Sequence, residues 1–272
     1  MFSLQPSVYY YKPKPRDDQQ VRDELGKLAQ SHPRWGFWMM HHRLRNLQFR
    51  WNHKKVYRIY RTMGLNLVRK HKKRLPARVM EPLLWPIGPN ITWSMDFMSD
   101  TLQNGVSYRS LNIIDDFNRE GLSLVMDKSL GSHRVVRELD QLIAWRGQPS
   151  KIRVDNGPEF IAQALAQWAE GRGIELKFIE PGSPYQNGYV ERFNRSFREE
   201  VMDAYCFERI QDAQTMAHAW LWTYNNERPH SALGYMTPVA FLDERRKGLK
   251  AFPSFVLNAS ENWDSLIVKA SS

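Results

Sequence analysis

The sequence predicts an α/β protein in which a small all-α module precedes a mixed five-stranded sheet flanked by helices. Apolar residues recur at helical spacing between residues 20 and 63, and from Ile91 onward they alternate with polar residues as in strands. In this second region three strands are followed by helix, strand, helix, strand and helix, the order expected of a mixed sheet. A chain of 272 residues is long enough for one full catalytic domain and a smaller module.

Composition restricts the class of protein. Hydrophobic residues make up 42% of the chain and aromatic residues 12%, which excludes a disordered polymer. No apolar run reaches the roughly 18 residues of a membrane-spanning helix, and the N-terminus lacks the apolar segment of a secretory signal. The single cysteine, Cys206, agrees with a cytoplasmic location.

Positive charge is concentrated in the first third of the chain. Residues 1–89 hold 19 of the 39 Lys and Arg residues but only 5 of the 29 Asp and Glu residues. This distribution is typical of a basic module that binds a polyanion, joined to a second domain that acts on it. A basic face that is merely solvated is the alternative.

The N-terminal module is expected at residues 20–66, after an irregular segment at residues 1–19. A first helix covers residues 20–30 and is stopped by a His-Pro pair. A second helix follows Gly36. Its apolar face carries three residues: Met40, Leu44 and Leu47.

A third helix extends from the N-cap residue Asn52 to a stop at Gly64. Its buried stripe has four residues: Val56, Ile59, Tyr60 and Met63. Three basic residues share the opposite face: Lys54, Arg58 and Arg61. Three short helices that end in one with an apolar back and a basic front fit a helix-turn-helix module, whose last helix enters the major groove of DNA. A plain three-helix core with solvated basic residues is the alternative.

Residues 67–90 are interpreted as a linker. A run of Lys and Arg is followed by four prolines, and no helical or strand period is sustained. Its basic half would suit a phosphate backbone, although an ordinary solvated linker fits the composition equally well.

The larger domain is expected at residues 91–247, before a tail at residues 248–272 that carries no recognisable signal. Its first strand starts at Ile91, and Asp96 projects from the face opposite the aromatic residues of that strand. Two further strands follow within a short distance, as in an antiparallel meander. They cover residues 108–114 and 122–126.

The remaining elements alternate between helix and strand. Ser132 is expected to cap an amphipathic helix, and a short strand ends at Asp155. An Asn-Gly turn then leads to a helix that begins at Pro158. Three residues form the expected buried face of that helix: Phe160, Ala164 and Trp168. The fifth strand covers residues 174–179.

Three acidic residues stand at element ends where their side chains can converge: Asp96, Asp155 and Glu191. Glu191 belongs to a helix within residues 184–200, whose apolar stripe places this residue at the margin of a core. Carboxylates suit Mg²⁺, a hard ion that prefers oxygen ligands. Two such ions activate a nucleophile and stabilise the leaving oxygen in phosphodiester cleavage. The pattern therefore predicts a metal-dependent enzyme that acts on a nucleic acid.

The motifs WSMDF, VDNGPEF and SPYQNGYVERFNRSFREE resemble those of DDE transposases of bacterial insertion sequences, which share their catalytic core with retroviral integrases. The 35 residues between Asp155 and Glu191 agree with that family, as does a basic residue seven positions after the glutamate, Arg198. The segment NNERPHSALGYMTPVAF, residues 225–241, is similar to the family's C-terminal signature. WGFWMMHHRLR followed by KKVYRIYRTMGL resembles the helix-turn-helix segment that precedes the core in many of these transposases.

This resemblance implies a ribonuclease H-like fold, two Mg²⁺ or Mn²⁺ ions per active site, and strand cleavage followed by strand transfer. By analogy with the family, Asp96 and Asp155 would be shared metal ligands and Glu191 a ligand of one ion. Water and then a DNA 3′-hydroxyl would act as nucleophile. Arg198 would contact terminal DNA phosphates, and Asn187 would lie in a mobile loop that meets DNA. The implied partners are terminal inverted repeats, target DNA and at least one further copy of the chain, because two ends must meet.

Several other polar residues are expected to be structural. Asp115 and Asp116 suit the turn after the second strand. Arg119 matches a family motif whose role is chiefly structural. Glu159 is interpreted as a charge at a helix N-terminus. His230 is interpreted as a packing or capping residue, with a DNA contact as the alternative.

One cysteine cannot supply the His and Cys zinc module of retroviral integrases, so no structural zinc is expected. In this group of insertion sequences the transposase is commonly a fusion of an upstream reading frame to one like this. The chain is therefore compatible with a downstream half whose partner is the upstream-frame protein, in a cytoplasmic, nucleoid-associated location. Two alternatives to a transposase are a truncated, inactive DNA-binding regulator and a nuclease without strand transfer. Without metal or DNA, Glu191 is expected to be the least well placed acid.

Overall fold

The computed structural model describes residue 10 and residues 17–67, 83–180 and 182–250. The chain divides into two units, Met1–Lys73 and Arg74–Ser272. Most of the predicted N-terminal segment, residues 68–82 of the predicted linker and nearly all of the predicted tail lie outside the described residues.

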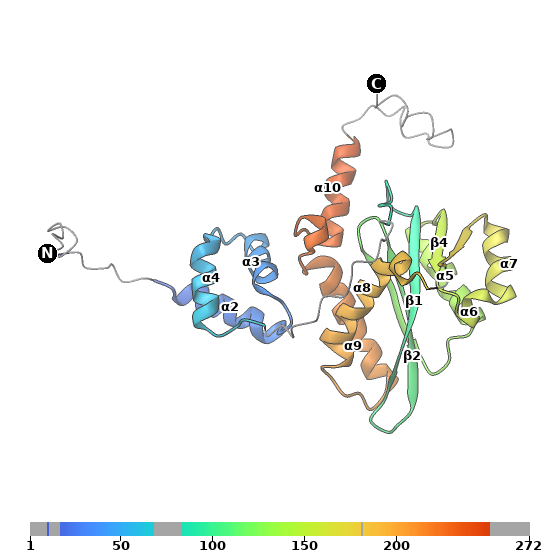
Figure 1. Cartoon of the computed structure of the whole chain (residues 1–272), viewed down its shortest axis with the longest axis horizontal. Helices are drawn as coiled ribbons and strands as arrows, with labels where there is room; N and C mark the ends of the chain where they lie inside the picture. The colour runs from blue at the N-terminus through green and yellow to red at the C-terminus, as the bar shows by residue number, and fades with distance from the viewer. Residues whose placement is uncertain (1–9, 11–16, 68–82, 181, 251–272) are drawn as a thin grey trace. The chain divides into compact units, whose positions relative to one another are not determined.

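The first unit contains three short helices, as predicted (Figure 1). They are α2 (Gln19–Ser31), α3 (Phe37–Asn46) and α4 (His53–Thr62). The side chain of Asn52 caps α4, because its Oδ1 accepts a 2.8 Å hydrogen bond from the backbone N–H of Lys54. Leu47 was expected on the buried face of α3, and this prediction is wrong. The helix ends at Asn46 and the chain turns away at Gln48, where φ is 69°, so Leu47 is exposed.

A mixed five-stranded sheet forms the centre of the second unit and confirms the predicted fold class. Its strands are β1 (Thr92–Thr101), β2 (Ser107–Asp115), β3 (Gly121–Asp127), β4 (Lys151–Val154) and β5 (Glu175–Phe178). The spatial order is β3-β2-β1-β4-β5. The first three strands pair antiparallel, whereas β4 runs parallel to both β1 and β5.

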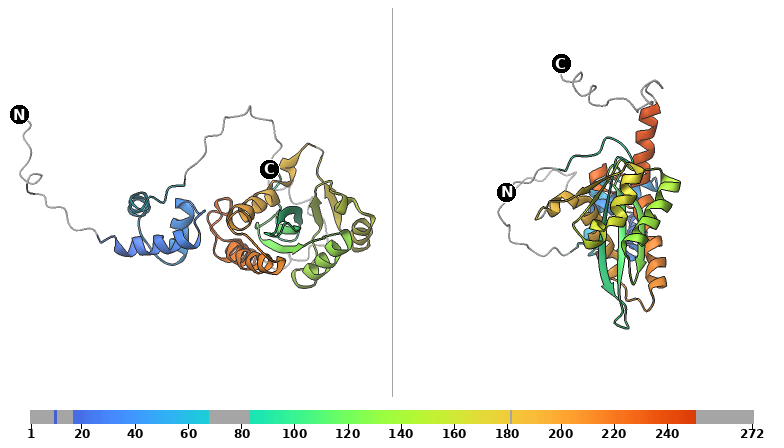
Figure 2. Two further views of the ribbon diagram at one scale, coloured as in Figure 1. Left: turned by 90° about the horizontal axis from the view of Figure 1, so that it is seen from below. Right: turned by 90° about the vertical axis from the view of Figure 1, so that its right-hand side faces the viewer.

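Helices cover both faces of this sheet (Figure 2). One face packs against α5 (Ser132–Arg146), α6 (Pro158–Ile161) and α7 (Gln163–Arg172). The other packs against α8 (Gly188–Phe197) and α9 (Ile210–Asn226). A π-helix (Arg198–Met202) continues α8, and α10 (Pro238–Lys250) closes the described chain. Alternation along β1 assigns Trp93 and Met95 to the first face and Met98 to the second.

Two predicted helix boundaries are wrong in detail. Gly131, rather than Ser132, is the N-cap residue of α5. The helix that begins at Pro158 is interrupted at Ala162, where ψ of 136° is extended, and α7 then starts in a new phase. Leu165 and Ala169 are therefore the buried residues of α7, whereas the predicted Trp168 is only partly buried against the same core cluster and Ala164 is not among the buried residues. The interruption also separates the short helix behind Asp155 from the longer one.

The second half of the predicted linker belongs to the larger unit. Trp85 donates a 2.8 Å hydrogen bond from its Nε1 to the backbone oxygen of Phe117, and its ring stacks on Phe241. Residues 83–90 thus contact the core, so a linker can extend only up to residue 82.

The outer edge of β3 is covered by two carboxamide side chains from α9. Gln214 accepts a 2.7 Å hydrogen bond from the N–H of Met126 and donates one of 2.8 Å to the carbonyl of Leu124. Asn225 makes the same pair of bonds with Gly121, at 2.9 and 2.8 Å. Each side-chain amide therefore makes one accepting and one donating hydrogen bond to the backbone of β3, as the backbone of a neighbouring strand would.

Candidate active site and DNA-binding surface

Asp96 lies on β1, on the face of the sheet that α8 covers. Its Oδ1 accepts a 2.8 Å hydrogen bond from the N–H of Phe97, and its Oδ2 accepts one of 2.8 Å from the side-chain amide of Asn194 on α8. The carbonyl of that amide accepts a 2.6 Å hydrogen bond from Asn112, which lies opposite Asp96 on β2. Two buried amides thus fix the orientation of one carboxylate.

Asp155 follows β4 directly, and the strand register brings it beside Asp96. Thr92 pairs with Lys151 and Ser94 with Arg153, and the same offset of 59 residues, continued two residues beyond the paired positions, sets Asp155 next to Asp96. The negative charge of Asp155 acts on Asp96 accordingly. Adjacent strands are about 4.8 Å apart. The loop is also fixed locally: Oδ1 of Asp155 accepts a 3.0 Å hydrogen bond from the N–H of Gly157.

The loop after Asp155 is held from two sides. Asn156 donates a 2.9 Å hydrogen bond to the backbone oxygen of Ile179, just beyond β5. Glu159, in the first turn of α6, forms an ion pair with Arg109 of β2, and the guanidinium of Arg109 lies 4.2 Å from the ring centroid of Phe97. Glu159 therefore has a structural role at the N-terminus of a helix, as the sequence predicted, and its ion pair connects α6 to β2.

Glu191 lies in the first turn of α8 and is exposed, whereas its neighbours Val190 and Phe193 are fully buried. Asn194, one turn further along the same face, is the residue that contacts Asp96. Glu191 therefore lies one helical turn from the residue that fixes Asp96, at the margin of the core.

The three acids influence one another electrostatically. The pKa of Asp96 is raised from 3.8 to about 6, chiefly by burial and to a smaller extent by the negative charges of Asp155 and Glu191, with Asp155 the stronger of the two. The N–H of Phe97 and the amide of Asn194 oppose this shift. Partial desolvation of the largely exposed Glu191 carboxylate also raises its pKa, against the charge of Arg195. The site accumulates negative charge that a cation would neutralise.

The donor set fits a hard divalent cation in chemistry, since all three side chains end in carboxylate oxygens. Across the described residues, however, no three His, Cys, Asp or Glu side chains are already grouped closely enough to hold a metal ion. Two of the acids are fixed by the sheet and its loop. Glu191 is the exposed member of the set.

Two residues near this site were predicted to contact DNA, and in the structure one is buried and the other is hydrogen-bonded to β1. Asn187 ends a 3₁₀ helix (Pro184–Asn187) with a side chain only 2% exposed, so a direct DNA contact by Asn187 is not available in this conformation. The buried Oδ1 of Asn187 has no hydrogen-bond partner among the described residues. Arg198 is partly exposed, and it donates a 3.0 Å hydrogen bond to the carbonyl of Ser99.

The turn after β2 forms a buried polar cluster, in agreement with its structural interpretation. Asp115 accepts hydrogen bonds from the N–H groups of Asn90 and Phe117, both at 2.9 Å, and burial raises its pKa to about 6. Asp116 pairs with Arg153 at 2.6 Å.

Arg119 and His230 are also structural. The guanidinium of Arg119 lies 3.3 Å from the ring centroid of Tyr189 on α8 and 4.9 Å from that of Trp85. The turn after β2 is thereby joined to the start of the helix that bears Glu191. Burial lowers the pKa of His230 to about 3, so its ring is neutral and packs against Tyr224.

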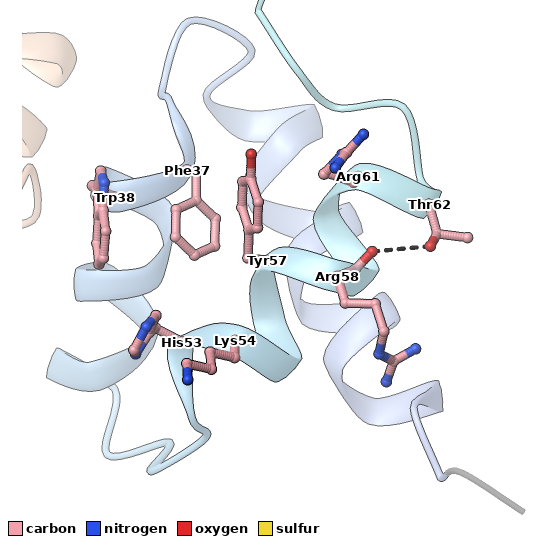
Figure 3. A pocket seen from close by; sticks show the side chains of 8 residues that line it. All are labelled: Phe37, Trp38, His53, Lys54, Tyr57, Arg58, Arg61 and Thr62. Carbon is pink, nitrogen blue, oxygen red and sulfur yellow. Dashed lines mark hydrogen bonds between the residues drawn. The ribbon is translucent and has the colours of Figure 1, made fainter.

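The first unit presents a basic face on α4. Lys54 and Arg61 are exposed, as the helical pattern predicts. Arg58 is different, because its guanidinium pairs with Asp18 at 2.8 Å and much of its charge is neutralised within the unit. An open cavity of about 760 Å³ lies on this face, and aromatic side chains from α3 and α4 contribute to its lining (Figure 3).

Comparisons with known proteins agree with this division. Residues 16–74 match the HTH-like domain family, and residues 87–184 and 172–238 match two families described as integrase core domains. The chain is 37% identical over 256 residues to a protein of insertion element IS407 from Burkholderia multivorans, with 94% of this chain and 92% of that protein covered. It is 40% identical to a protein of insertion element IS476 from Xanthomonas euvesicatoria, of which it spans 64%, while 82% of this chain is covered.

A DNA-binding module joined to an integrase core defines a polynucleotidyl transferase class of protein. Within that class, the chain belongs to the transposase family of bacterial insertion sequences. Among solved structures, it is similar to the catalytic core domain of HTLV-2 integrase in complex with magnesium, with 21% identity and a TM-score of 0.46 over 57% of this chain and 97% of that one. Within the described residues, no helix is both long and apolar enough to cross a membrane.

Sequence reasoning missed three residues of this site: Asn194, Asn112 and Arg109. The signal for Asn194 was present, because it lies three residues after Glu191 on the same helical face. Nothing in the sequence indicated its partner on β1, which is 98 residues away.

Proposed function

We propose that the chain catalyses metal-dependent DNA strand cleavage and strand transfer at insertion-sequence ends, with Asp96, Asp155 and Glu191 as the catalytic carboxylates. The proposal is supported chiefly by the register of β1 and β4, whose offset leads from Asp96 to Asp155, and by the hydrogen bond through which Asn194 joins Asp96 to the helix of Glu191. No structural role requires like charges at this position, and their proximity destabilises the fold unless a cation is present.

Asp96 and Asp155 would hold the metal ions jointly, and Glu191 would complete the site of one of them. Mg²⁺ or Mn²⁺, two ions per site, would promote ionisation of the nucleophile and stabilise the departing oxygen. Asn194 and Asn112 keep the carboxylate of Asp96 in one orientation, which is the usual function of residues behind a metal ligand.

The bond changes are the same in both steps. In cleavage, the oxygen of water attacks the phosphorus at the element's end, and the bond from phosphorus to the 3′-oxygen breaks to leave a 3′-hydroxyl. In strand transfer, that hydroxyl attacks a phosphorus of the target DNA and displaces the target's own 3′-oxygen. Each step forms one P–O bond to the attacking oxygen and breaks one P–O bond to a 3′-oxygen, while the attacking oxygen loses a proton to solvent and the departing oxygen takes one up. Cleavage therefore leaves a 5′-phosphate and a 3′-hydroxyl, strand transfer leaves a new phosphodiester and a 3′-hydroxyl, and neither step needs a covalent link to the protein.

Lys54 and Arg61 of α4, together with Arg198, would contribute phosphate contacts to DNA binding. Because two ends must be joined, the active form would contain at least two copies of the chain, with the upstream-frame protein as a further candidate partner. The chain would act at the bacterial nucleoid.

The test uses the full chain and duplexes that carry the element's own terminal sequence. Asp155→Asn and Glu191→Gln should each abolish cleavage and joining in Mg²⁺ and in Mn²⁺ while duplex affinity is retained. Two matched controls lie nearby: Asp100→Asn on β1 and Glu199→Gln, an exposed acid two turns beyond Glu191. Both controls should retain activity.

Each other outcome has a defined meaning. Full activity in a variant removes that residue from the site. A wild-type chain that binds the ends but never cleaves them, even with the upstream-frame protein added, is a DNA-binding regulator. Cleaved ends without joined products indicate a nuclease.

A further inference from the structure

Three aromatic rings line the open cavity on the first unit. Figure 3 shows Trp38, Phe37 and Tyr57 in a row from α3 to α4, with Arg61 beyond Tyr57. Phe37 is half-buried and contacts the other two rings edge-on, at centroid distances of 5.1 Å to Trp38 and 4.8 Å to Tyr57. Trp38 is 49% exposed and Tyr57 is 43% exposed. Each of these two large rings is therefore supported by the protein yet open to solvent.

The hydrophobic core of the unit does not require these two exposed rings. Its buried cluster is built from other residues of the three helices, including Trp35, Leu44 and Ile59. Trp38 and Tyr57 lie outside that cluster, although a helix surface is normally occupied by polar side chains. Exposed aromatic rings that are held in place indicate a surface that binds a partner.

The charge around the rings restricts the chemistry of that partner. Tyr57 lies between Lys54 and Arg61 on one face of α4, at spacings of three and four residues. Neither cation has an ion-pair partner in the part of the chain that the structure describes. Residues 17–67 carry 10 Lys and Arg against 4 Asp and Glu. The partner must therefore combine negative charge with a flat apolar face.

We propose that this cavity binds unpaired nucleotides at an end of the DNA. One base would stack on Trp38 and a second on Tyr57, because Phe37 lies between these two rings, and the phosphates would contact Lys54 and Arg61. Base stacking on protein aromatic rings combined with cations along the backbone is the general mode by which proteins hold single-stranded nucleic acids. The proposal rests on the DNA binding proposed above and adds a preference for unpaired nucleotides at the DNA end.

A fully paired duplex could not stack a base on the ring of Trp38 or of Tyr57. Its bases expose their edges in the grooves, while their faces are covered by neighbouring base pairs. Only an unpaired or displaced base can offer a face to Trp38 or Tyr57. The same α4 surface can still contact phosphates of paired DNA through its cations.

The experiment compares two probes that share one duplex sequence. One probe is blunt, and the other has a three-nucleotide 3′ overhang with 2-aminopurine at its first unpaired position. Affinity of the full chain is measured by anisotropy, and stacking by quenching of 2-aminopurine fluorescence. We expect tighter binding of the overhang probe, with quenching. Trp38→Leu and Tyr57→Gln should each weaken binding of that probe by roughly 5- to 150-fold, the range for loss of one stacked base.

The controls separate stacking from a general loss of fold or charge. Tyr57→Phe keeps the ring and should retain the preference for the overhang. Trp145→Leu removes a ring that is 63% exposed on α5 of the larger unit, and it should change neither affinity. Binding of the blunt duplex should stay within about twofold in every ring variant, and circular dichroism should show unchanged helix content.

Two results would overturn the nucleotide site. One is equal affinity of the wild-type chain for both probes, and the other is an equal loss for both probes in the ring variants. A chain that binds neither probe contradicts the DNA binding of the first unit itself. The two proposals therefore fail in different ways.

Discussion

Replacement of Asp96 by asparagine should stabilise the metal-free protein at neutral pH although it removes a proposed catalytic group. The pKa of Asp96 is raised from 3.8 to about 6 in the folded chain. A shift of about two units corresponds to about 3 kcal/mol of destabilisation by the ionised carboxylate. Asparagine cannot accept both hydrogen bonds that Asp96 receives, and the loss of one costs about 1 kcal/mol. The net gain should be about 1–2 kcal/mol.

The effect has a defined pH window. A carboxyl group with a raised folded-state pKa binds its proton more tightly in the folded than in the unfolded chain. The destabilisation of the folded chain by the ionised Asp96 carboxylate is therefore absent below about pH 4, grows as the pH rises towards 6, and is complete above 6. The pKa of Asp115 is also raised to about 6, so Asp115 contributes to the pH dependence of stability in the same range. The contribution of Asp96 is therefore measured as the difference in stability between wild type and Asp96→Asn.

Thermal unfolding from pH 4.5 to 8, with and without Mg²⁺, measures this difference. At pH 8 the Tm of Asp96→Asn should exceed that of wild type by about 2–8 °C, and at pH 4.5 the two should nearly coincide. Mg²⁺ at ten times its Kd should stabilise wild type by about 1.4 kcal/mol and leave the variant unchanged. Asp100→Asn is the matched control, since Asp100 also accepts a 2.8 Å hydrogen bond from the next N–H of β1. A variant that is less stable at every pH, or that Mg²⁺ stabilises equally, would refute the reasoning.

Two further predictions concern cations. Arg119→Lys should destabilise the larger unit by about 1–3 kcal/mol in urea unfolding, because an ammonium cannot lie flat between two rings. The more exposed Arg172→Lys should cost less than about 0.5 kcal/mol, and equal effects would show that the stacking is unimportant. In DNA binding, Lys54→Ala should lower the salt dependence, the slope of log K against log salt, by about one. Arg58→Ala should lower it less, because Asp18 already neutralises Arg58, and a larger effect of Arg58 would show that DNA displaces this pair.

Much of the fold follows from local patterns. Alternation along the first strand was sufficient to assign Asp96 to the face opposite the aromatic residues. A strand that ends within one residue of Asp155 and is followed by Pro158 at a helix start could be recognised from residue types alone. These features depend on backbone geometry within about ten residues, which composition and spacing determine.

Contacts between distant residues could not be predicted in the same way. Arg58 pairs with Asp18 across 40 positions, so its place on the basic face of α4 was visible in the sequence but its partial neutralisation was not. Asn187 was expected in a mobile loop that meets DNA. The 3₁₀ helix instead turns its side chain inward, and this depends on tertiary packing.

The two carboxamides of α9 have a consequence for how copies of the chain can meet. Gln214 and Asn225 occupy the outward N–H and C=O groups of β3 at both ends of the strand. A strand from a second copy could not extend the sheet there unless both side chains first withdrew, because the main-chain groups it needs are already bonded. Copies that associate on this side would have to meet through helix surfaces. The central sheet would then remain unchanged in the assembly on two DNA ends that we propose.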